Sequence, residues 1–153
     1  MGKIDQRLKE LDITLPSPAA PVANYVPYVV AGGLAFISGQ VSTAPDGLIK
    51  GRLGEDMDVD QGAEAARACA INLVAQLKAA AGGDLDRVKR VVKLGAFVNS
   101  TPDFTDQPKV ANGASDLMVA IFGEAGRHAR AAVGAPSLPL GAAVEIDGVF
   151  EIA

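Results

Sequence analysis

The sequence predicts one α+β domain, in which two helices cover one face of a mostly antiparallel or mixed sheet. Three observations lead to this prediction. Apolar residues recur at intervals of three and four up to Ala81, which is the spacing of one helix face. From Val144 to Ile152, apolar and acidic residues alternate, which is the pattern of a half-buried strand. Two β-prone runs also flank Gly32 and Gly33, as in a hairpin.

The composition limits how such a domain is stabilised. The chain has 153 residues, enough for one ordinary domain and too few for two. Hydrophobic residues make up 49% of it, but aromatic residues only 5%, and Trp is absent. The core must therefore be built from small aliphatic side chains, each of which buries little apolar area at roughly 25 cal/mol per Å². A second source of burial, such as oligomerisation, is expected.

The chain divides into an N-terminal extension, residues 1–21, and a single domain, residues 22–153. Within the extension, residues 3–11 place their apolar side chains at helical spacing, which predicts a short amphipathic helix. Residues 15–21 contain three prolines, which impose an extended or irregular path. We expect this segment to form a strap over the surface.

The domain is expected to follow the order β-β-loop-α-β-α-β-β. The elements before the C-terminal strands are a hairpin (28–31 and 34–38), a loop with one short strand (42–58), a helix capped by Asp58 or Asp60 and ending at Ala81, a turn (84–88), a central strand (91–98) and a second helix (108–122). Gly113 lies in the second helix and costs roughly 1 kcal/mol relative to Ala. The first half of this helix is therefore expected to tolerate irregularity.

Residues 127–152 are predicted to form two strands joined by a tight turn at 138–141, where Pro and Gly interrupt two alternating runs. In such a hairpin Glu145 lies opposite about Gly134, four residues from Arg130. At roughly 3.3 Å per residue, Arg130 and Glu145 are then about 13 Å apart along the strands. We expect no direct salt bridge, but both side chains can reach one small molecule.

Arg130 and Glu145 are the candidate functional pair. Glu145 lies on the polar face of the last strand, and Arg130 shares a strand face with Ala132 and Gly134, which are too small to cover a guanidinium. That face is expected to be an open floor. A guanidinium binds a carboxylate through two parallel hydrogen bonds. A carboxyl group beside an apolar floor has a raised pKa and can transfer protons near neutral pH. The pair predicts a site that anchors an organic acid.

Charge and composition count against several other functions. The net charge is −4 and the isoelectric point is about 4.9, without the basic stripe that nucleic-acid binding requires. The N-terminus has no apolar core of a signal peptide, no run approaches the ~20 apolar residues of a membrane span, and Cys69 has no disulfide partner. We expect a soluble, cytoplasmic protein. His128 and the scattered acids lack metal-ligand spacing, so no metal site is predicted.

Several motifs together resemble one family. They are Ala129-Arg130-Ala131-Ala132-Val133, Leu138-Pro139 and Val144-Glu145-Ile146 near the C-terminus, with Tyr25 and Phe36-Ile37-Ser38-Gly39-Gln40 upstream. This set resembles the RidA family, also called YjgF/YER057c/UK114 or the L-PSP endoribonuclease family, in which a Glu follows the Arg by fifteen positions, as here (145 − 130 = 15). The resemblance covers roughly residues 22–152 and implies a chorismate-mutase-like fold assembled as a homotrimer.

The resemblance also implies a reaction and a set of site residues. RidA proteins hydrolyse reactive 2-imino or enamine acids to 2-keto acids and ammonia, without a metal or an organic cofactor. By this resemblance, Arg130 holds the substrate carboxylate and Glu145 positions and activates the attacking water. The site lies at a subunit interface, and its further lining residues here are Tyr25, Ser38, Gly39 and, through its backbone, Ala132.

The chain departs from the family pattern beside the Arg and in the second helix. His128 stands where Pro or Ala is usual, and its position next to Arg130 makes it an alternative proton donor. Many deaminating members carry an Asn in the second helix; Asn112 fits this position only with a shift, and direct counting points to Ser115. With the N-terminal extension, these departures indicate a divergent, longer subgroup.

Two other functions remain open. A non-catalytic trimer that binds small carboxylates is favoured by the lack of a clear counterpart of the Asn. An endoribonuclease or translation inhibitor is suggested by the history of the family, but the acidic net charge disfavours it.

Overall fold

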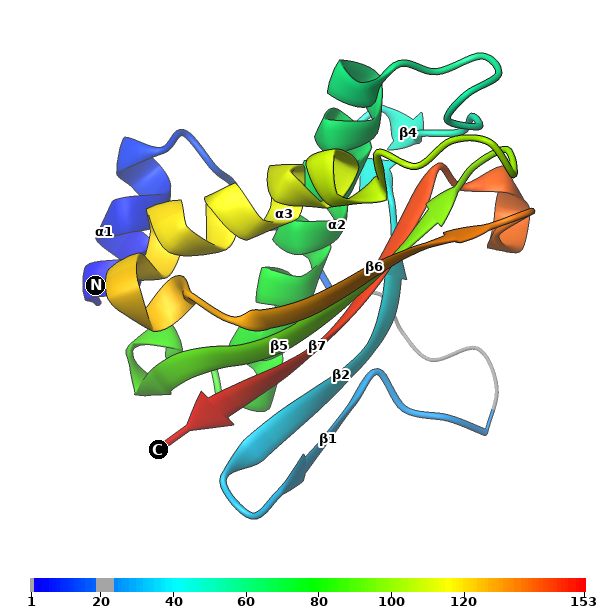
Figure 1. Cartoon of the computed structure of the whole chain (residues 1–153). Coiled ribbons are helices and arrows are strands. Elements are labelled where there is room, and N and C mark those ends of the chain that lie inside the picture. Colours follow the sequence, from blue (N-terminus) through cyan, green and yellow to red (C-terminus); the bar gives the residue numbers. More distant parts are fainter. Residues whose placement is uncertain (1, 19–23) are drawn as a thin grey trace.

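A computed structural model describes residues 2–18 and 24–153. Its elements are α1 (Lys3–Glu10), β1 (Tyr28–Ala31), β2 (Leu34–Val41), β3 (Thr43–Ala44), β4 (Gly47–Leu48), α2 (Val59–Ala80), β5 (Val88–Asn99), α3 (Gln107–Phe122), β6 (Ala129–Ala135) and β7 (Val144–Ile152). Five strands form one sheet in the order β1-β2-β7-β5-β6, and α2 and α3 cover one face of it (Figure 1). The predicted α+β class is confirmed. The sheet is mixed, because β5 and β6 are parallel whereas the other pairs are antiparallel.

The helix α2 begins at a capping box. The Asp58 side chain accepts a hydrogen bond of 2.8 Å from the Gln61 N–H, and the Gln61 side chain accepts one of 2.9 Å from the Asp58 N–H. Small apolar residues of α2 are fully buried against the sheet, including Ala65, Ala66, Cys69, Ala70 and Leu73. The helix ends at Ala80, just before the left-handed Gly82, so the predicted end at Ala81 is accurate to one residue.

The helix α3 is regular through Gly113, contrary to the expectation that its first half tolerates irregularity. A Cβ on Gly113 would collide with the backbone of Ala63 in α2. The glycine therefore lets the two helices approach closely, and this contact outweighs its poor helix propensity. Small residues on both helices explain how a domain poor in aromatic residues still packs densely.

We expect Gly113→Ala to lower the free energy of unfolding by roughly 1–3 kcal/mol, because the added methyl group overpacks a contact with a helix backbone that cannot move aside locally. An exposed helical Gly→Ala change would instead stabilise by about 1 kcal/mol. Urea denaturation distinguishes the two. The control is Lys109→Ala on the exposed side of α3, expected within about 0.5 kcal/mol of wild type. If the Gly113→Ala protein is as stable as wild type, the proposed close contact between α3 and the backbone of α2 is contradicted.

The predicted C-terminal hairpin is wrong. The strands β6 and β7 were correctly located, but they do not pair, because β5 lies between them. The connection at 136–143, which includes a short 3-10 helix, passes the end of β5 instead of turning back tightly. Arg130 therefore pairs with Leu94 of β5, and Glu145 pairs with Phe97 of β5.

The two faces of the sheet differ in what they carry. On β7, Val144, Ile146 and Phe150 are fully buried under the helices. The opposite face, which we call the open face, has no helix over it among the described residues (Figure 1). It exposes large apolar side chains: Val29 (52%), Phe36 (44%), Phe97 (38%) and Val133 (48%). An uncovered apolar face of this kind is typical of a surface that meets another protein chain.

The N-terminal extension is attached to the domain through α1. The N–H groups of Lys3 and Ile4 each donate a 2.9 Å hydrogen bond to the Asp86 carboxylate, and these bonds hold the pKa of Asp86 below its ordinary value. Leu8 is buried in the core. The predicted helix at 3–11 is confirmed as Lys3–Glu10. Part of the predicted strap, residues 19–21, and its boundary with the domain lie outside the described residues.

Candidate functional site

Arg130 lies on the helix-bearing face of the edge strand β6. Its register partner Leu94 is 1% exposed, and residues paired across neighbouring strands project from the same face. The Arg130 Nη1 group donates to Asn112 Oδ1 at 2.9 Å and to Ser115 Oγ at 3.1 Å, and both acceptors belong to α3. Two neutral side chains therefore hold one end of the guanidinium in place.

The expectation that Arg130 stands on an open floor is wrong. The same strand face is covered by α3: Ala132 packs against the core, and a Cβ on Gly134 would meet the side chains of Ser100 and Gln107. Small residues occur here because the helix lies close to the strand. The expected role of the Ala132 backbone in lining the site stays a prediction.

The other edge of the guanidinium is available to a ligand. Among residues 2–18 and 24–153, neither Nε nor Nη2 of Arg130 has a hydrogen-bond partner, and no carboxylate forms an ion pair with the group. These two N–H groups form the side of the fork that grips a carboxylate through two parallel bonds. Arg130 lines a cavity of about 470 Å³ together with Ser115, Arg127 and His128.

Asn112 was not assigned a role from the sequence, where direct counting favoured Ser115. The structure brings both to Arg130, because positions three apart lie on the same side of a helix. His128 joins the same group: its Nε2 lies 2.8 Å from Ser115 Oγ, and its Nδ1 lies 2.6 Å from the Gly126 carbonyl oxygen. We call Arg130, Asn112, Ser115 and His128 the Arg130 half-site.

Glu145 projects from the open face of the sheet, as its place in the alternating strand predicts. It is half-buried, and its pKa is raised above the ordinary value, first by desolvation and then by the negative charge of Asp147. The direction of this shift is the one expected from the sequence. A Cβ on Gly39 would collide with the Glu145 carboxylate, so the glycine leaves room for the carboxyl group at the bulge of β2.

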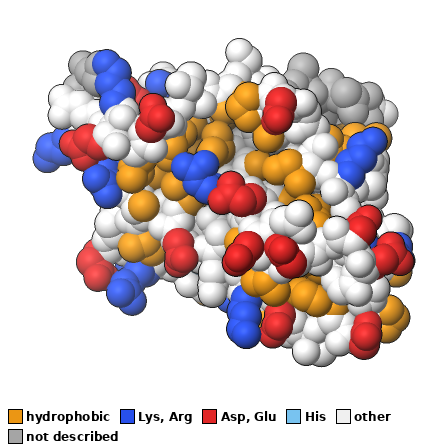
Figure 2. Space-filling model, turned by 90° about the horizontal axis from the view of Figure 1, so that it is seen from above, with side chains coloured by type: hydrophobic (Ala, Val, Ile, Leu, Met, Phe, Trp, Pro, Cys, Tyr) orange, Lys and Arg blue, Asp and Glu red, His pale blue; other side chains and the backbone are white. Residues whose placement is uncertain are grey.

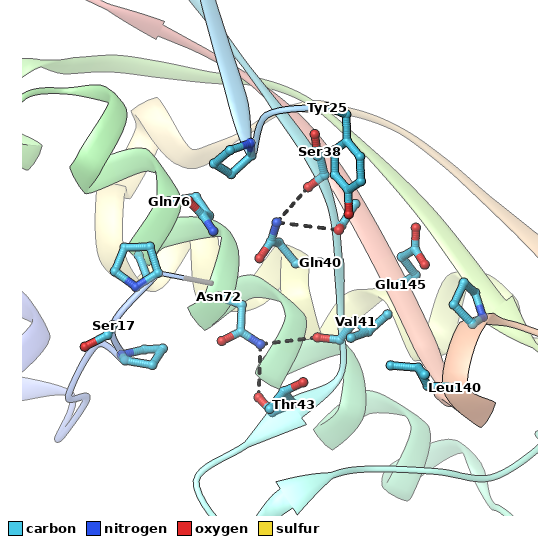
Figure 3. A pocket seen from close by; sticks show the side chains of 16 residues that line it. Ser17, Tyr25, Ser38, Gln40, Val41, Thr43, Asn72, Gln76, Leu140 and Glu145 are labelled. Atoms are coloured by element: carbon cyan, nitrogen blue, oxygen red, sulfur yellow. Dashed lines mark hydrogen bonds between the residues drawn. The ribbon is translucent and has the colours of Figure 1, made fainter. Parts of the chain in front are cut away.

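Three of the residues expected around Glu145 lie beside it. Tyr25, Ser38 and Gly39 line the same cavity as Glu145, of about 560 Å³ (Figure 3). The Ser38 hydroxyl donates to the Val26 carbonyl at 2.9 Å, which ties the segment carrying Tyr25 to β2. We call Glu145, Tyr25, Ser38 and Gly39 the Glu145 half-site.

The opposite wall of this cavity is polar and was not predicted. Gln40, Asn72 and Gln76 place amide side chains there, and Pro16 and Ser17 of the N-terminal strap close it on the helix side (Figure 3). Asn72 Nδ2 donates to the carbonyls of Val41 (3.2 Å) and Thr43 (3.0 Å), so it fixes the end of β2. Asn72 and Gln76 are four residues apart on α2, but no spacing in the sequence links them to Gln40, because the helix and the strand meet only in the fold.

The two half-sites lie on opposite faces of the sheet. Arg130 faces α3, whereas Glu145 shares the open face with its register partner Phe97. One chain cannot present both groups to the same small ligand, because the sheet itself separates them. A single site containing both requires the Arg130 half-site of one copy to meet the Glu145 half-site of another.

Within residues 2–18 and 24–153, no three His, Cys, Asp or Glu side chains are grouped as metal ligands, and no helix is long and apolar enough to cross a bilayer. Figure 2 views the molecule from above, where the described acidic and basic side chains are interspersed without a basic stripe. Cys69 is buried, and its burial raises the thiol pKa, which makes it an unreactive core residue.

A mixed sheet backed by two helices, with an arginine half-site on the helix-bearing face and a carboxyl half-site on the open face, defines a small protein of the α+β class. The chain belongs to the YjgF family, whose model, described as "YjgF/chorismate_mutase-like, putative endoribonuclease", matches residues 5–150. The resemblance found in the sequence is thereby confirmed at the level of the family.

Individual relatives agree with this assignment. Protein TCP17 of Trypanosoma cruzi is 54% identical over 153 residues, which cover 99% of this chain and 95% of that protein. The structure of protein Atu1372 from Agrobacterium tumefaciens, of unknown function, is 49% identical with a TM-score of 0.91, covering 98% of this chain and 92% of that one. A "putative endoribonuclease" from Shewanella oneidensis is 36% identical with a TM-score of 0.93, covering 99% and 100%.

More distant members share the fold over less of the chain. The YjgF gene product of Escherichia coli is 24% identical, with a TM-score of 0.60 over 88% of this chain and 92% of that one. The higher structural agreement with the Agrobacterium and Shewanella proteins extends over nearly the full length of the chain, as expected for a longer subgroup of the family.

Proposed function

We propose that the protein hydrolyses reactive 2-imino or enamine acids to 2-keto acids and ammonia, in a site formed between two copies of the chain. The observation that carries the proposal is the open edge of the Arg130 guanidinium. Its Nη1 group is held by Asn112 and Ser115, so the group is oriented, while Nε and Nη2 lack partners in the described chain. An oriented fork with a vacant edge suits a substrate carboxylate.

The same geometry supports self-association of the chain. The half-sites lie on opposite faces of the sheet, and the open face exposes apolar side chains such as Phe36 and Phe97. Burying that face between copies would supply the area that the small-residue core lacks. We propose a homotrimer, the assembly that the family resemblance implies, in which each Arg130 half-site meets the Glu145 half-site of a neighbour.

The residues then divide the reaction between them. Arg130 binds the substrate carboxylate and holds the imine carbon in place. Ionised Glu145 accepts a proton from water as the water oxygen bonds to that carbon, and the C=N double bond becomes a single bond with its electron pair on nitrogen. The protonated Glu145 returns the proton to the nitrogen, which gives a carbinolamine. Glu145 then takes the proton of the carbinolamine hydroxyl and passes it to the nitrogen, so that the C–N bond breaks, the C=O bond forms and ammonia leaves. The raised pKa of Glu145 suits both directions of transfer.

The structure bears on the two alternative functions, a carboxylate-binding trimer and an endoribonuclease. A non-catalytic carboxylate-binding trimer was favoured by the apparent lack of an Asn, but Asn112 does contact Arg130, so that argument no longer applies. An endoribonuclease is what the family description names, yet the net charge of the chain is −4 and the face seen in Figure 2 shows no basic stripe of the kind that holds a phosphate backbone.

Wild-type protein is expected to shorten the lifetime of 2-aminoacrylate generated in the assay by a pyridoxal-phosphate-dependent serine dehydratase. The measurement is the rate of pyruvate formation and the amount of a damaged reporter enzyme, with and without the protein. Tight binding of pyruvate without acceleration would select the carboxylate-binding trimer. Cleavage of RNA that persists through purification, with no effect on 2-aminoacrylate, would select the endoribonuclease.

A further inference from the structure

Ser115 and His128 form a hydrogen-bonded pair to which the proposed imine hydrolysis assigns no bond-making or proton-transfer step. Ser115 Oγ lies 2.8 Å from His128 Nε2, and His128 Nδ1 lies 2.6 Å from the Gly126 carbonyl oxygen. Both side chains are half-buried and line the cavity of about 470 Å³ that also contains Arg130. Ser115 has no partner in the described chain other than His128 and Arg130.

The direction of each hydrogen bond follows from the donors available. A carbonyl oxygen only accepts, so His128 Nδ1 must carry a proton to bond to Gly126. In the neutral imidazole, Nε2 then has a free lone pair and accepts the Ser115 hydroxyl proton. The Ser115 oxygen in turn accepts from Arg130 Nη1 at 3.1 Å. The result is one continuous chain of donors that points from the guanidinium to the Gly126 carbonyl.

This arrangement matches the geometry that activates a serine. A nucleophilic serine needs a base within about 2.6–3.2 Å of its hydroxyl and a third group that fixes the orientation of the base. His128 Nε2 meets the first condition, and the Gly126 carbonyl meets the second by fixing the ring and its tautomer. The nearby Arg130 cation also stabilises negative charge that develops on the serine oxygen or on the carbonyl oxygen under attack.

We propose that Ser115 and His128 are a nucleophile and general base for acyl transfer from small esters that carry a carboxylate. Ser115 Oγ bonds to the ester carbonyl carbon while His128 Nε2 takes the hydroxyl proton. The C–O bond to the alcohol then breaks, and the alcohol leaves with that proton. A water oxygen then bonds to the acyl carbon while His128 Nε2 takes the water proton. The bond from that carbon to Ser115 Oγ breaks, His128 returns the proton to Oγ, and the acid leaves. Arg130 selects the substrate class, because its vacant Nε and Nη2 edge anchors the free carboxylate.

The first test uses diisopropyl fluorophosphate, which needs no imine chemistry and no carboxylate. Ser115 Oγ is expected to displace fluoride and form one stable phosphoryl adduct per chain, seen as a mass increase of the intact protein and located by fragmentation. Ser115→Ala is expected to abolish the adduct. His128→Gln removes the base and is expected to slow labelling by at least about 100-fold. Ser137→Ala, which removes an exposed serine outside both half-sites, is expected to label at the wild-type rate.

The second test addresses the substrate class with a matched pair of esters, the 4-nitrophenyl monoester of adipic acid and 4-nitrophenyl hexanoate. They have equal chain length and differ in one carboxylate. The adipate ester is expected to be hydrolysed at least about 10-fold faster in kcat/KM, as a charge-assisted hydrogen bond to Arg130 predicts.

The dyad is overturned if wild-type protein forms no adduct or forms the adduct on a residue other than Ser115. It is also overturned if wild type and His128→Gln are labelled at the same rate. Equal rates for the two esters overturn the assigned substrate class. These outcomes are separate from those of the imine assay. Labelling at Ser115 without acceleration of 2-aminoacrylate hydrolysis keeps the dyad and rejects the deaminase, and the reverse result rejects only the dyad.

Discussion

Arg130→Ala is expected to lower kcat/KM for 2-aminoacrylate hydrolysis by roughly 10²–10⁴-fold. The change removes two charge-assisted hydrogen bonds to the substrate carboxylate, each worth about 1.5–3 kcal/mol. It also removes the group that fixes the position of the imine carbon relative to the attacking water. Stopped-flow or coupled measurement of pyruvate formation gives the effect. The fold is expected to persist, because within the described part of the chain the Arg130 side chain bonds to two neutral side chains of α3 and to no charged group.

The matched control for this variant is Arg127→Ala. Arg127 lies in the same segment and also lines the cavity, but its side chain is 68% exposed and pairs with Glu124 at 3.4 Å. Loss of this exposed cation is expected to change kcat/KM less than about threefold, since surface ion pairs contribute at most about 1 kcal/mol. If Arg130→Ala and Arg127→Ala behave alike, Arg130 is an ordinary surface charge and the carboxylate-anchoring role is wrong.

Glu145→Gln is expected to lower kcat by roughly 10²–10⁴-fold, because an amide cannot accept the proton of the attacking water. In wild type, activity should fall as pH drops through the raised pKa of Glu145, since only the ionised carboxylate is a base. The acid limb of the pH profile is therefore expected above the ordinary pKa of a glutamate. The residual activity of Glu145→Gln should not show this decrease at low pH.

The same substitution should not weaken the fold. The pKa of Glu145 is raised in the folded chain, so the folded state binds its proton more tightly than the unfolded state does. Ionisation of Glu145 therefore costs stability as pH rises through this window, and Gln removes that cost at neutral pH. We expect Glu145→Gln to be at least as stable as wild type at pH 7. Glu151→Gln, on the same strand face, is the control and should retain full activity.

The local elements were predictable from the sequence because their signals are local. The helix α2 carries its cap at Asp58 and its apolar periodicity within one stretch of chain, and the hairpin of β1 and β2 is defined by Gly32-Gly33. The open-face position of Glu145 and the direction of its pKa shift also follow from alternation within β7.

Strand pairing and the surroundings of Arg130 were not predictable in the same way. A turn between two strands does not reveal that a third strand, β5, inserts between them. Ala132 and Gly134 indicate a strand face without bulky residues, but small residues suit both an open floor and a face on which a helix packs closely. The contact of Arg130 with Asn112 depends on which strand lies beneath α3, and no residue spacing carries that information.

The central claim is that one ligand is held by Arg130 of one copy and by Glu145 of another. Arg130→Ala and Glu145→Gln proteins, each inactive alone, should regain activity when unfolded together in equal amounts and refolded. In a closed ring that assembles at random, each contact has an intact Arg130 half-site about half of the time and an intact Glu145 half-site about half of the time. Both are intact at about one quarter of the contacts, so about one quarter of wild-type activity is predicted. Wild-type protein that is unfolded and refolded in the same way is the control and should recover its activity. If it does and the refolded mixture stays as inactive as each variant alone, the shared site is contradicted.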